Sequence, residues 1–304
     1  MSRPLIVDFV KMHGAENDFV IVDNRFFRFS DAELSTLAAE RCPRRTGIGA
    51  DGLLALAPPE SDENDYRMRY FNADGSRATM CGNGARCLAR FARDAGLEAN
   101  PLTFESDAGV YRAEVIEGAD PRIRLFVPPP EDYAAHVALK HDDHEPAAID
   151  YVWTGTEHAV CFVDDLSATP VEEQGQAIRH DDAFTPTGAN ANFVEVLAEG
   201  SAETGETARL AVRTYEKGVE AETRACGTGA LAAAVVARRQ ARVATDRIAV
   251  QMPGGTLIAG VQWEGDRIRS LYLEGPATYV FRGTVEVQPK ELQQRAQQQK
   301  ADEE

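Results

Sequence analysis

Two cysteines lie in nearly identical glycine-rich contexts and are the residues best suited to chemistry. Cys81 begins the segment Cys-Gly-Asn-Gly-Ala, and Cys226 begins the segment Cys-Gly-Thr-Gly-Ala. An apolar, helix-forming stretch follows each segment, so each cysteine is expected where a loop enters a helix. Backbone N–H groups and the helix dipole bind anions at such a position and lower the pKa of a thiol. The sequence therefore predicts two ionisable thiols, each beside a site for a carboxylate or phosphate.

A pair of such thiols points to one class of reaction. Inversion of a carbon stereocentre needs a base that removes a proton from one face and an acid that delivers one to the other. A thiolate and a thiol fill these roles and exchange them when the reaction runs backwards. The pair predicts a two-base racemase or epimerase. The other cysteines, Cys42, Cys87 and Cys161, lack this context and are predicted to be small buried hydrophobic residues.

The elements that must position the two thiols are repeated along the chain. At a constant offset of 145 residues the matches include Tyr70 with Tyr215, Gly109 with Gly254, Arg122–Arg124 with Arg267–Arg269, and more weakly His13 with His158. Each half is expected to hold a strand, a turn-rich loop, a helix that starts at the cysteine segment, and then alternating strands. The predicted strands are 66–71, 111–116 and 122–127 in the first half, and 209–215, 247–252, 256–261 and 267–273 in the second.

The duplication predicts an α/β (α+β) fold with two pseudo-symmetric domains. Residues 1–127 with a returning strand at 277–287 form the half that carries Cys81, and residues 128–276 form the half that carries Cys226. Three consecutive prolines, Pro128–Pro130, fit the crossover between the halves. Residues 288–304 form a polar tail that is expected to fray.

The composition excludes several classes of function. The chain has 304 residues, of which 43% are hydrophobic and 27% charged, so it is globular. A formal charge of −17 argues against binding to nucleic acid or to anionic membranes. Only five of the 32 basic residues are lysine, which favours a protein of a high-salt interior over an ordinary acidic cytosolic protein, although both remain open.

The sequence also predicts a cytoplasmic location. No apolar signal segment stands at the N-terminus, and the longest apolar stretch, 229–237, is too short to cross a bilayer. Five cysteines without a Cys-x-x-Cys spacing indicate neither a disulfide framework nor a zinc site.

Two further motifs are assigned no function. The segment 47–52 fits Gly-x-Gly-x-x-Gly, but it precedes an apolar strand instead of opening a helix, so a turn is predicted there and not a dinucleotide site. His136, His141 and His144 lie in an acidic loop, for which a solvated loop is favoured over a metal site. No metal is expected.

Longer motifs resemble those of the diaminopimelate epimerase family. They occur in the expected order from about residue 8 to 283: Met12–Gly14, Asn17–Val20, Phe71–Ser76, Met80–Cys87, Asn190–Glu195, and Arg213–Gly218 leading into Ala225–Gly229. The resemblance implies a cofactor-independent enzyme that interconverts LL- and meso-2,6-diaminopimelate in lysine and peptidoglycan synthesis. It also implies domains in which a strand layer wraps around a central helix, an active site in the cleft between them, and a homodimer.

The resemblance assigns roles to individual residues. Cys81 and Cys226 are implied to be the acid/base pair, and His158 and Glu216 are implied to tune the thiols. The implied ligands of the substrate are Asn17, Asn72, Gly82, Asn83, Asn190, Glu216, Lys217, Gly227 and Thr228, with Thr156 as a further substitute. Neutral amides suit a substrate with two carboxylates and two ammonium groups.

The chain departs from the family pattern at three places, and two other functions stay open. Lys217 stands where arginine is usual, the stretch Gly218–Cys226 is one residue longer than in many members, and Thr156-Glu157-His158 replaces the usual Asn-Pro-His. Lysine lacks the bidentate fork of arginine, so carboxylate recognition is expected to be looser. The alternatives are a related amino-acid racemase, such as a proline racemase-like enzyme, and a thiol redox protein that would use Cys81 and Cys226. A redox protein would not need the surrounding asparagines and glycine-rich loops.

Overall fold

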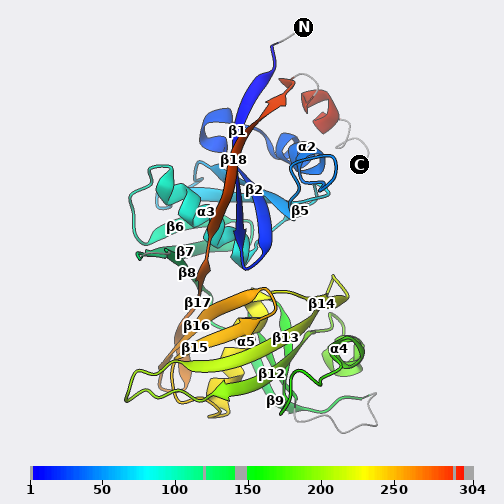
Figure 1. Cartoon of the computed structure of the whole chain (residues 1–304), viewed down its shortest axis with the longest axis vertical. Coiled ribbons are helices and arrows are strands. Elements are labelled where there is room, and N and C mark those ends of the chain that lie inside the picture. Colours follow the sequence, from blue (N-terminus) through cyan, green and yellow to red (C-terminus); the bar gives the residue numbers. More distant parts are fainter. Residues whose placement is uncertain (1–2, 119–120, 141–148, 290–291, 298–304) are drawn as a thin grey trace. The chain divides into compact units, whose positions relative to one another are not determined.

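The structure is a computed structural model that describes residues 3–118, 121–140, 149–289 and 292–297. It divides into two compact units, Met1–Leu125 with Pro276–Glu304 as unit 1 and Phe126–Gly275 as unit 2. Figure 1 labels their elements. The first unit is therefore built from the two ends of the chain, and the second from its middle.

Unit 1 contains helices α1, α2 and α3 and most of the early strands. They are β1 (Leu5–Gly14), β2 (Asn17–Asp23), α1 (Asn24–Phe27), α2 (Asp31–Arg41), β3 (Gly52–Ala57), β4 (Tyr66–Asn72), β5 (Arg77–Ala78), α3 (Gly82–Asp94), β6 (Leu102–Ser106), β7 (Gly109–Ile116), β8 (Arg122–Val127), which ends two residues beyond the unit, and β18 (Thr278–Val287). The segment with the Gly-x-Gly-x-x-Gly pattern leads into β3, as expected.

Unit 2 repeats this sequence of elements. They are β9 (Glu131–Val137), β10 (Ile149–Trp153), β11 (Glu157–Phe162), α4 (Val171–His180), the short 3-10 helix η1 (Asp182–Phe184), β12 (Asn190–Ala198), β13 (Ala208–Glu216), β14 (Ala221–Thr223), α5 (Gly227–Arg239), β15 (Arg247–Met252), β16 (Gly255–Glu264) and β17 (Arg267–Pro276, whose last residue belongs to unit 1). Every predicted strand is confirmed, and both predicted helices begin directly after their cysteines.

The strands of the two units pair in the same way. In unit 1, β1 is antiparallel to β2, β2 parallel to β3, β3 antiparallel to β4, β4 parallel to β6, and β6 antiparallel to β7. In unit 2 the same series runs through β10, β11, β12, β13, β15 and β16. Helices α2 and α4 connect the first parallel pair of each unit, and α3 and α5 the second. The shared topology agrees with the duplication inferred from the sequence offset.

One helix lies at the centre of each unit. Helix α3 packs against β1, β2, β3 and β7, while α5 packs against β10, β11, β12, β13, β15 and β16. Residues Gly229–Ala237 of α5 are buried without interruption. A helix that is apolar on all sides must be enclosed, and its many alanines let strands approach closely. Each strand layer therefore wraps around a helix whose N-terminal cap is a cysteine.

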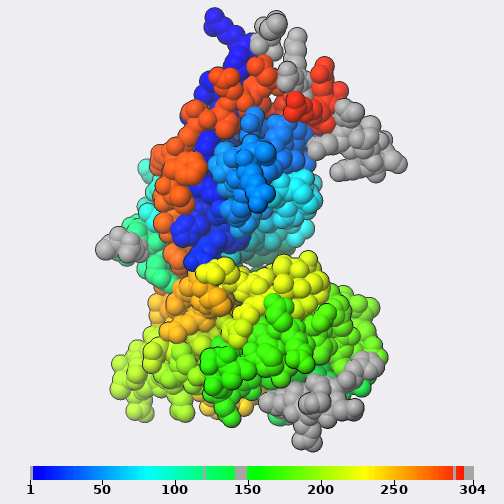
Figure 2. Space-filling model, turned by 45° about the vertical axis from the view of Figure 1, so that its right-hand side comes forward, coloured from blue at the N-terminus to red at the C-terminus, as the bar shows by residue number. Residues whose placement is uncertain are grey.

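The C-terminal segment packs against unit 1. Strand β18 pairs with β1, and Figures 1 and 2 show the orange strand beside the blue N-terminal one. Residues 292–297 are helical, with Leu292 and Ala296 only 4% exposed, and Arg295 forms an ion pair with Glu40. The prediction of a frayed tail is wrong for these residues. Two buried apolar side chains four positions apart lie on one face of the segment, and Leu292 on this face belongs to the hydrophobic cluster of unit 1.

Candidate active site

Cys81 lies in a small cluster of amide side chains. It is the N-cap of α3 with an extended backbone, and its side chain is partly exposed. The thiol donates to Asn17 Oδ1 (3.4 Å), and the same oxygen accepts from Asn83 Nδ2 (3.3 Å). Asn17 Nδ2 in turn donates to Asp51 Oδ2 (2.7 Å). The structure thus brings together three of the predicted site residues, and it adds Asp51, which the sequence analysis does not identify.

Arg86 contacts this cluster through Asn83 and is a second residue to which the sequence analysis assigns no role. It is 0% exposed, and it donates from Nη2 to Asn83 Oδ1 (2.7 Å) and from Nη1 to the carbonyl of Gly82 (3.3 Å). Burial lowers the pKa of the guanidinium to about 10, which leaves it positively charged at neutral pH. The first turn of α3, directly after Cys81, is therefore held by a buried cation.

Asn72 lies in a turn at the end of β4. Its side chain donates to Ser76 Oγ (3.0 Å), and its backbone N–H donates to the carbonyl of Ser76 (2.8 Å). Gly75 completes this turn with a φ of 89°, which a glycine adopts readily. These contacts hold the turn together. None of the hydrogen bonds among the described residues joins Asn72 to Cys81.

Cys226 occupies the matching position in unit 2 but is more deeply buried. It is the N-cap of α5, is 7% exposed, and accepts the backbone N–H of Gly229 at Sγ (3.4 Å), while Thr228 Oγ1 lies 3.5 Å away. Burial, together with the nearby carboxylate of Glu216, raises the pKa of this thiol to about 12. Hydrogen bonds from Thr228 and Gly229 act in the opposite direction. The prediction that the helix N-terminus lowers the pKa of Cys226 is therefore wrong for the net shift, because burial outweighs these bonds.

Glu216 ends strand β13 beside Cys226. The hairpin of β13 and β14 pairs Thr214 with Thr223, and this places the hydroxyl of Thr223 where it donates to Glu216 Oε2 (2.7 Å). Burial raises the pKa of Glu216. The acidic residue predicted to tune the thiols is thus the charged neighbour of one of them.

Asn190 links three strands. It is 2% exposed, its Oδ1 accepts the backbone N–H of Lys217 (2.9 Å), and its Nδ2 donates to the carbonyl of Glu157 (2.9 Å). Both polar atoms of the Asn190 amide therefore form hydrogen bonds with backbone groups. The structure brings Asn190 and Lys217 together, as a shared site requires.

The residues that depart from the family pattern contact one another. Lys217 forms an ion pair with Glu157, whose carboxylate also accepts from Thr156 Oγ1 (3.0 Å). Burial acts to raise the pKa of Glu157, but Lys217, Thr156 and other donors outweigh it and lower the pKa to about 2. The two departures from the motif are thus one paired change, in which a lysine is accompanied by its own carboxylate.

His158 is fully buried and neutral. Asn192 Nδ2 lies 3.0 Å from His158 Nδ1, so this nitrogen is the acceptor and the proton is on Nε2, which has no partner among the described residues. Burial lowers the pKa of His158 to about 3. Asn192 Oδ1 accepts from Thr214 Oγ1 (3.0 Å). Asn192 lies within a recognised motif, yet neither it nor Thr214 is a predicted site residue.

The predicted tuning residues differ in what surrounds them. The charged neighbours of His158 are Lys217 and Glu157, whereas Glu216 is the charged neighbour of Cys226. Of these two residues, Glu216 is the one that raises the pKa of Cys226.

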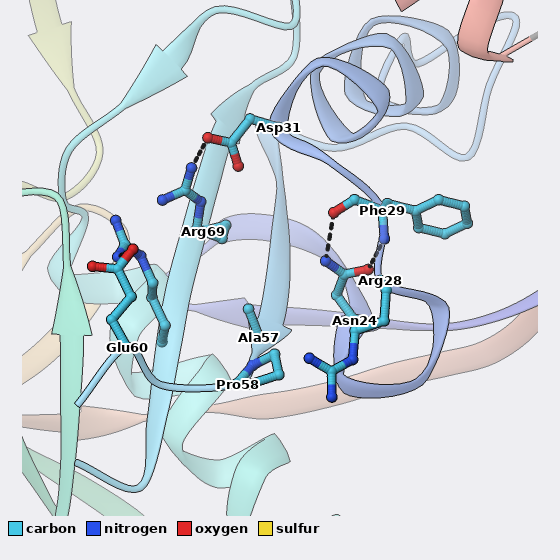
Figure 3. A pocket seen from close by; sticks show the side chains of 9 residues that line it. Asn24, Arg28, Phe29, Asp31, Ala57, Pro58, Glu60 and Arg69 are labelled. Carbon is cyan, nitrogen blue, oxygen red and sulfur yellow. Dashed lines mark hydrogen bonds and ion pairs between the residues drawn. The ribbon is translucent and has the colours of Figure 1, made fainter. Parts of the chain in front are cut away.

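A surface pocket of about 280 Å³ lies elsewhere on unit 1 (Figure 3). Its charged residues are largely paired with one another, Arg69 with Asp31 and Arg67 with Glu60. It contains none of the predicted site residues, and we assign it no role.

Two kinds of feature are absent from the described residues. No group of three or more His, Cys, Asp or Glu side chains that could hold a metal occurs in that part of the chain, which includes His136. His141 and His144 lie outside the described residues. No helix in the same part is long and apolar enough to cross a membrane.

Comparisons with known proteins bear on the identity of these elements. Residues 9–123 and 151–280 match the family model for diaminopimelate epimerase. The chain is 39% identical to the diaminopimelate epimerase of Chlorobaculum tepidum over 281 residues, covering 90% of this chain and 99% of that protein. It is also 39% identical to the diaminopimelate epimerase of Methanothrix thermoacetophila over 290 residues, covering 92% and 96%.

Solved structures share the fold at low identity. A phenazine biosynthesis protein of the PhzF family from Bacillus anthracis superposes with a TM-score of 0.69 at 17% identity, covering 93% of this chain and 100% of that one. A hydroxyproline epimerase from Agrobacterium vitis gives 0.59 at 15%, covering 94% and 93%. The sequence matches are much closer than these. The chain belongs to the diaminopimelate epimerase family of isomerases.

Proposed function

We propose that this chain interconverts LL- and meso-2,6-diaminopimelate by two-base proton transfer at the α-carbon, with Cys81 and Cys226 as the acid/base pair. The observation that carries the proposal is the occurrence of a cysteine at the N-cap of both central helices, in two units of one topology, within a chain of this family. A thiol redox protein would need neither the duplication nor the amide cluster around Cys81.

The chemistry balances without further reactants. One thiolate takes the α-proton and becomes a thiol, and the electron pair of the broken C–H bond spreads into the substrate carboxylate. The other thiol delivers its proton to the opposite face of the carbon and becomes a thiolate. The N–H groups that follow each cysteine, from Gly82 and Asn83 or from Gly227 and Thr228, are placed to bind a carboxylate. The reverse reaction exchanges the two roles, and no cofactor takes part.

The remaining predicted residues serve recognition and tuning in this proposal. Asn17, Asn72, Asn190 and Thr156 offer neutral donors and acceptors, while Lys217 and Glu216 offer charges for the second amino-acid group of the substrate. Glu216 and His158 set the charge around the thiols. The stable contacts of Asn190 with backbone favour a supporting position beside the substrate.

The wider setting is part of the proposal. The enzyme acts as a cytoplasmic homodimer in lysine and peptidoglycan precursor synthesis, binds neither nucleic acid nor membrane, and presents an acidic surface. The halves 1–127 with 277–287 and 128–276 are its two functional domains, each contributing one thiol, and 288–304 is a tail.

Proton exchange in D₂O tests the proposal. LL-Diaminopimelate is incubated with reduced, folded protein at high salt and followed by NMR. Loss of the α-proton signal with appearance of the meso form is expected. Cys81→Ala and Cys226→Ala should each lower epimerisation by about 10²–10⁴-fold or more. Each variant should retain exchange on only one epimer, and the two variants should differ in which.

The opposite results are equally clear. Absence of exchange in folded, reduced wild-type protein would contradict the diaminopimelate assignment, and proline would be the next substrate to test. Epimerisation at the wild-type rate in either cysteine variant, or exchange on both epimers in one variant, would contradict the two-thiol mechanism.

A further inference from the structure

Arg86 is a buried cation without a carboxylate. It is 0% exposed, its Nε has no hydrogen-bond partner among the described residues, and no ion pair within that part of the chain includes it. Burying a charge is costly unless it is paired or serves another group. Other arginines of unit 1, such as Arg67 and Arg69, are paired with carboxylates.

The guanidinium sets the orientation of two amides. Because Arg86 Nη2 donates to Asn83 Oδ1 (2.7 Å), the other end of that amide, Nδ2, faces Asn17. Asn17 is held at its own Nδ2 by Asp51, so its Oδ1 must face Asn83 and Cys81. An amide presents a donor and an acceptor that cannot be exchanged without flipping. The hydrogen bonds that lead from Arg86 through Asn83 and Asn17 to Cys81 therefore allow only one orientation of each amide.

The second unit has no cation at the matching position. At the offset of 145 residues the position of Arg86 is occupied by Leu231, which is 1% exposed. The position of Glu216 in unit 2 is occupied in unit 1 by Phe71, which is 2% exposed. One cysteine thus has a buried positive charge near it, and the other a largely buried carboxylic acid.

From this juxtaposition we propose that Arg86 is a positioning residue: it fixes Asn83 and Asn17 against Cys81, and its charge favours the ionised form of that thiol over the ionised form of Cys226. The proposal deepens the function above, since it rests on Cys81 as one of the two acid/base groups. Charges interact more strongly where water is partly excluded, so a buried cation beside Cys81 favours the thiolate of that residue.

Two further titratable groups described beside Cys81 do not supply the same charge. Besides Arg86, the groups that interact electrostatically with Cys81 include Cys87 on α3 and Tyr70 on β4. Burial keeps both Cys87 and Tyr70 neutral at physiological pH, since it raises the pKa of Cys87 to about 12 and also raises the pKa of Tyr70 well above its ordinary value.

The other charged groups named here are paired with each other or act on Arg86 and Cys87. Asp51, behind Asn17, is paired with Arg44. On β1 and β2, Lys11 is paired with Asp18. Arg122 of β8 and Arg90 of α3 act on Arg86 and Cys87 respectively. Among these groups Arg86 is the cation that interacts with Cys81 itself.

Alkylation kinetics test the proposal without any substrate. Iodoacetamide labelling is followed by peptide mass spectrometry from pH 6 to 11, which gives a separate profile for each cysteine. In wild-type protein, Cys81 should react at a lower pH than Cys226. Arg86→Gln, which keeps an amide donor and removes the charge, should shift the Cys81 profile upward by one pH unit or more, an about tenfold slower reaction at neutral pH. The profile of Cys226 should not move.

Arg86→Lys is the matched control. It keeps the charge, so the alkylation rate of Cys81 should stay within a few fold of wild type across the pH profile. If Arg86→Lys and Arg86→Gln instead shift the Cys81 profile equally, Arg86 has a purely structural role. A wild-type protein in which Cys226 reacts at the lower pH would overturn the proposal, and so would an unshifted Cys81 profile in folded Arg86→Gln. If Arg86→Gln does not fold, the wild-type order of the two thiols can still overturn the proposal. Epimerase activity, measured separately, tells this failure apart from failure of the proposed function.

Discussion

At the scale of single residues, Cys226 and Glu216 oppose each other's ionisation. Glu216→Gln removes a negative charge that raises the pKa of Cys226, so the pKa is expected to fall below about 12. Alkylation of Cys226 at pH 8 to 9 should become faster while epimerisation becomes slower, because the carboxylate is also a proposed substrate ligand. Peptide mapping after labelling measures the first effect, and NMR exchange measures the second. Glu206→Gln, an exposed carboxylate of the same unit, serves as control and should change neither.

The ion pair of Lys217 with Glu157 predicts strong coupling between two unusual residues. Lys217→Met leaves the partly buried carboxylate of Glu157 without its ion-pair partner. We therefore expect the free energy of unfolding to fall by about 1–3 kcal/mol. Lys217→Met with Glu157→Gln should regain most of it. Urea denaturation at pH 7 of all four proteins gives the coupling energy. Additive losses would contradict the pairing.

The same pair predicts a direction of pH dependence. The pKa of Glu157 is lowered to about 2, so its stabilising contribution is complete above the ordinary pKa of a glutamate and is lost as the pH falls towards 2. The coupling energy measured at pH 7 should therefore shrink at pH 3. A coupling energy that is unchanged at pH 3 would indicate that the contact between Lys217 and Glu157 does not depend on the charge of the carboxylate.

At the scale of elements, the two central helices differ in how tightly their first turn is enclosed. A Cβ at Gly229 would collide with Asn192 Oδ1 and lie 3.2 Å from Cys226 Sγ, while a Cβ at the matching Gly84 would lie 3.3 Å from Leu54 and Phe19. Gly229→Ala should cost about 1–3 kcal/mol of stability, since Asn192 is held by several hydrogen bonds and cannot move aside.

Gly84→Ala is the matched control for that substitution. Its neighbours are apolar and need to move only slightly, and alanine gains helix propensity, so its stability should stay within about 1 kcal/mol of wild type. Thermal or urea unfolding of both variants measures the contrast. Equal losses would contradict the difference in packing between the helices.

The elements themselves were largely predictable because the repeat supplies two copies of each signal. Strands Arg122–Val127 and Arg247–Met252 have the predicted bounds, and both helices start after their cysteines. Helix α2 was not predicted, although Ser30 and Glu33 form a capping box that is a recognisable start signal. The burial of Cys226 could not be predicted, because it depends on how α5 packs against strands that are distant in sequence, such as β12. The role of Arg86 could not be predicted for a different reason: a helical arginine is ordinarily at the surface.

At the scale of the whole molecule, buried thiols link stability to alkaline pH. Burial raises the pKa of Cys42, Cys87 and Cys226 to about 12 and that of Cys161 to about 11. The unfolded chain ionises its thiols first, near pH 8.5, so the stabilisation is complete below that pH and is lost as the pH rises towards 12. Each such thiol contributes a slope of up to about 1.4 kcal/mol per pH unit in this range.

Urea unfolding under reducing conditions at pH 8, 9.5 and 10.5 measures this loss. Cys42→Ala with Cys161→Ala removes two of the groups and should make the fall shallower, whatever the stability at pH 8. A free energy of unfolding that does not change between pH 8 and 10.5 would contradict the burial of these thiols.

The composition of unit 1 from both ends of the chain has a consequence for synthesis on the ribosome. Strand β1 is synthesised before unit 2, but its partner β18 is synthesised after all of unit 2. Unit 2 is contiguous and can form its own strand pairs while the chain is still growing, whereas the edge of β1 that pairs with β18 stays open until β18 has been made. A nascent chain of this protein thus completes unit 2 before it completes unit 1.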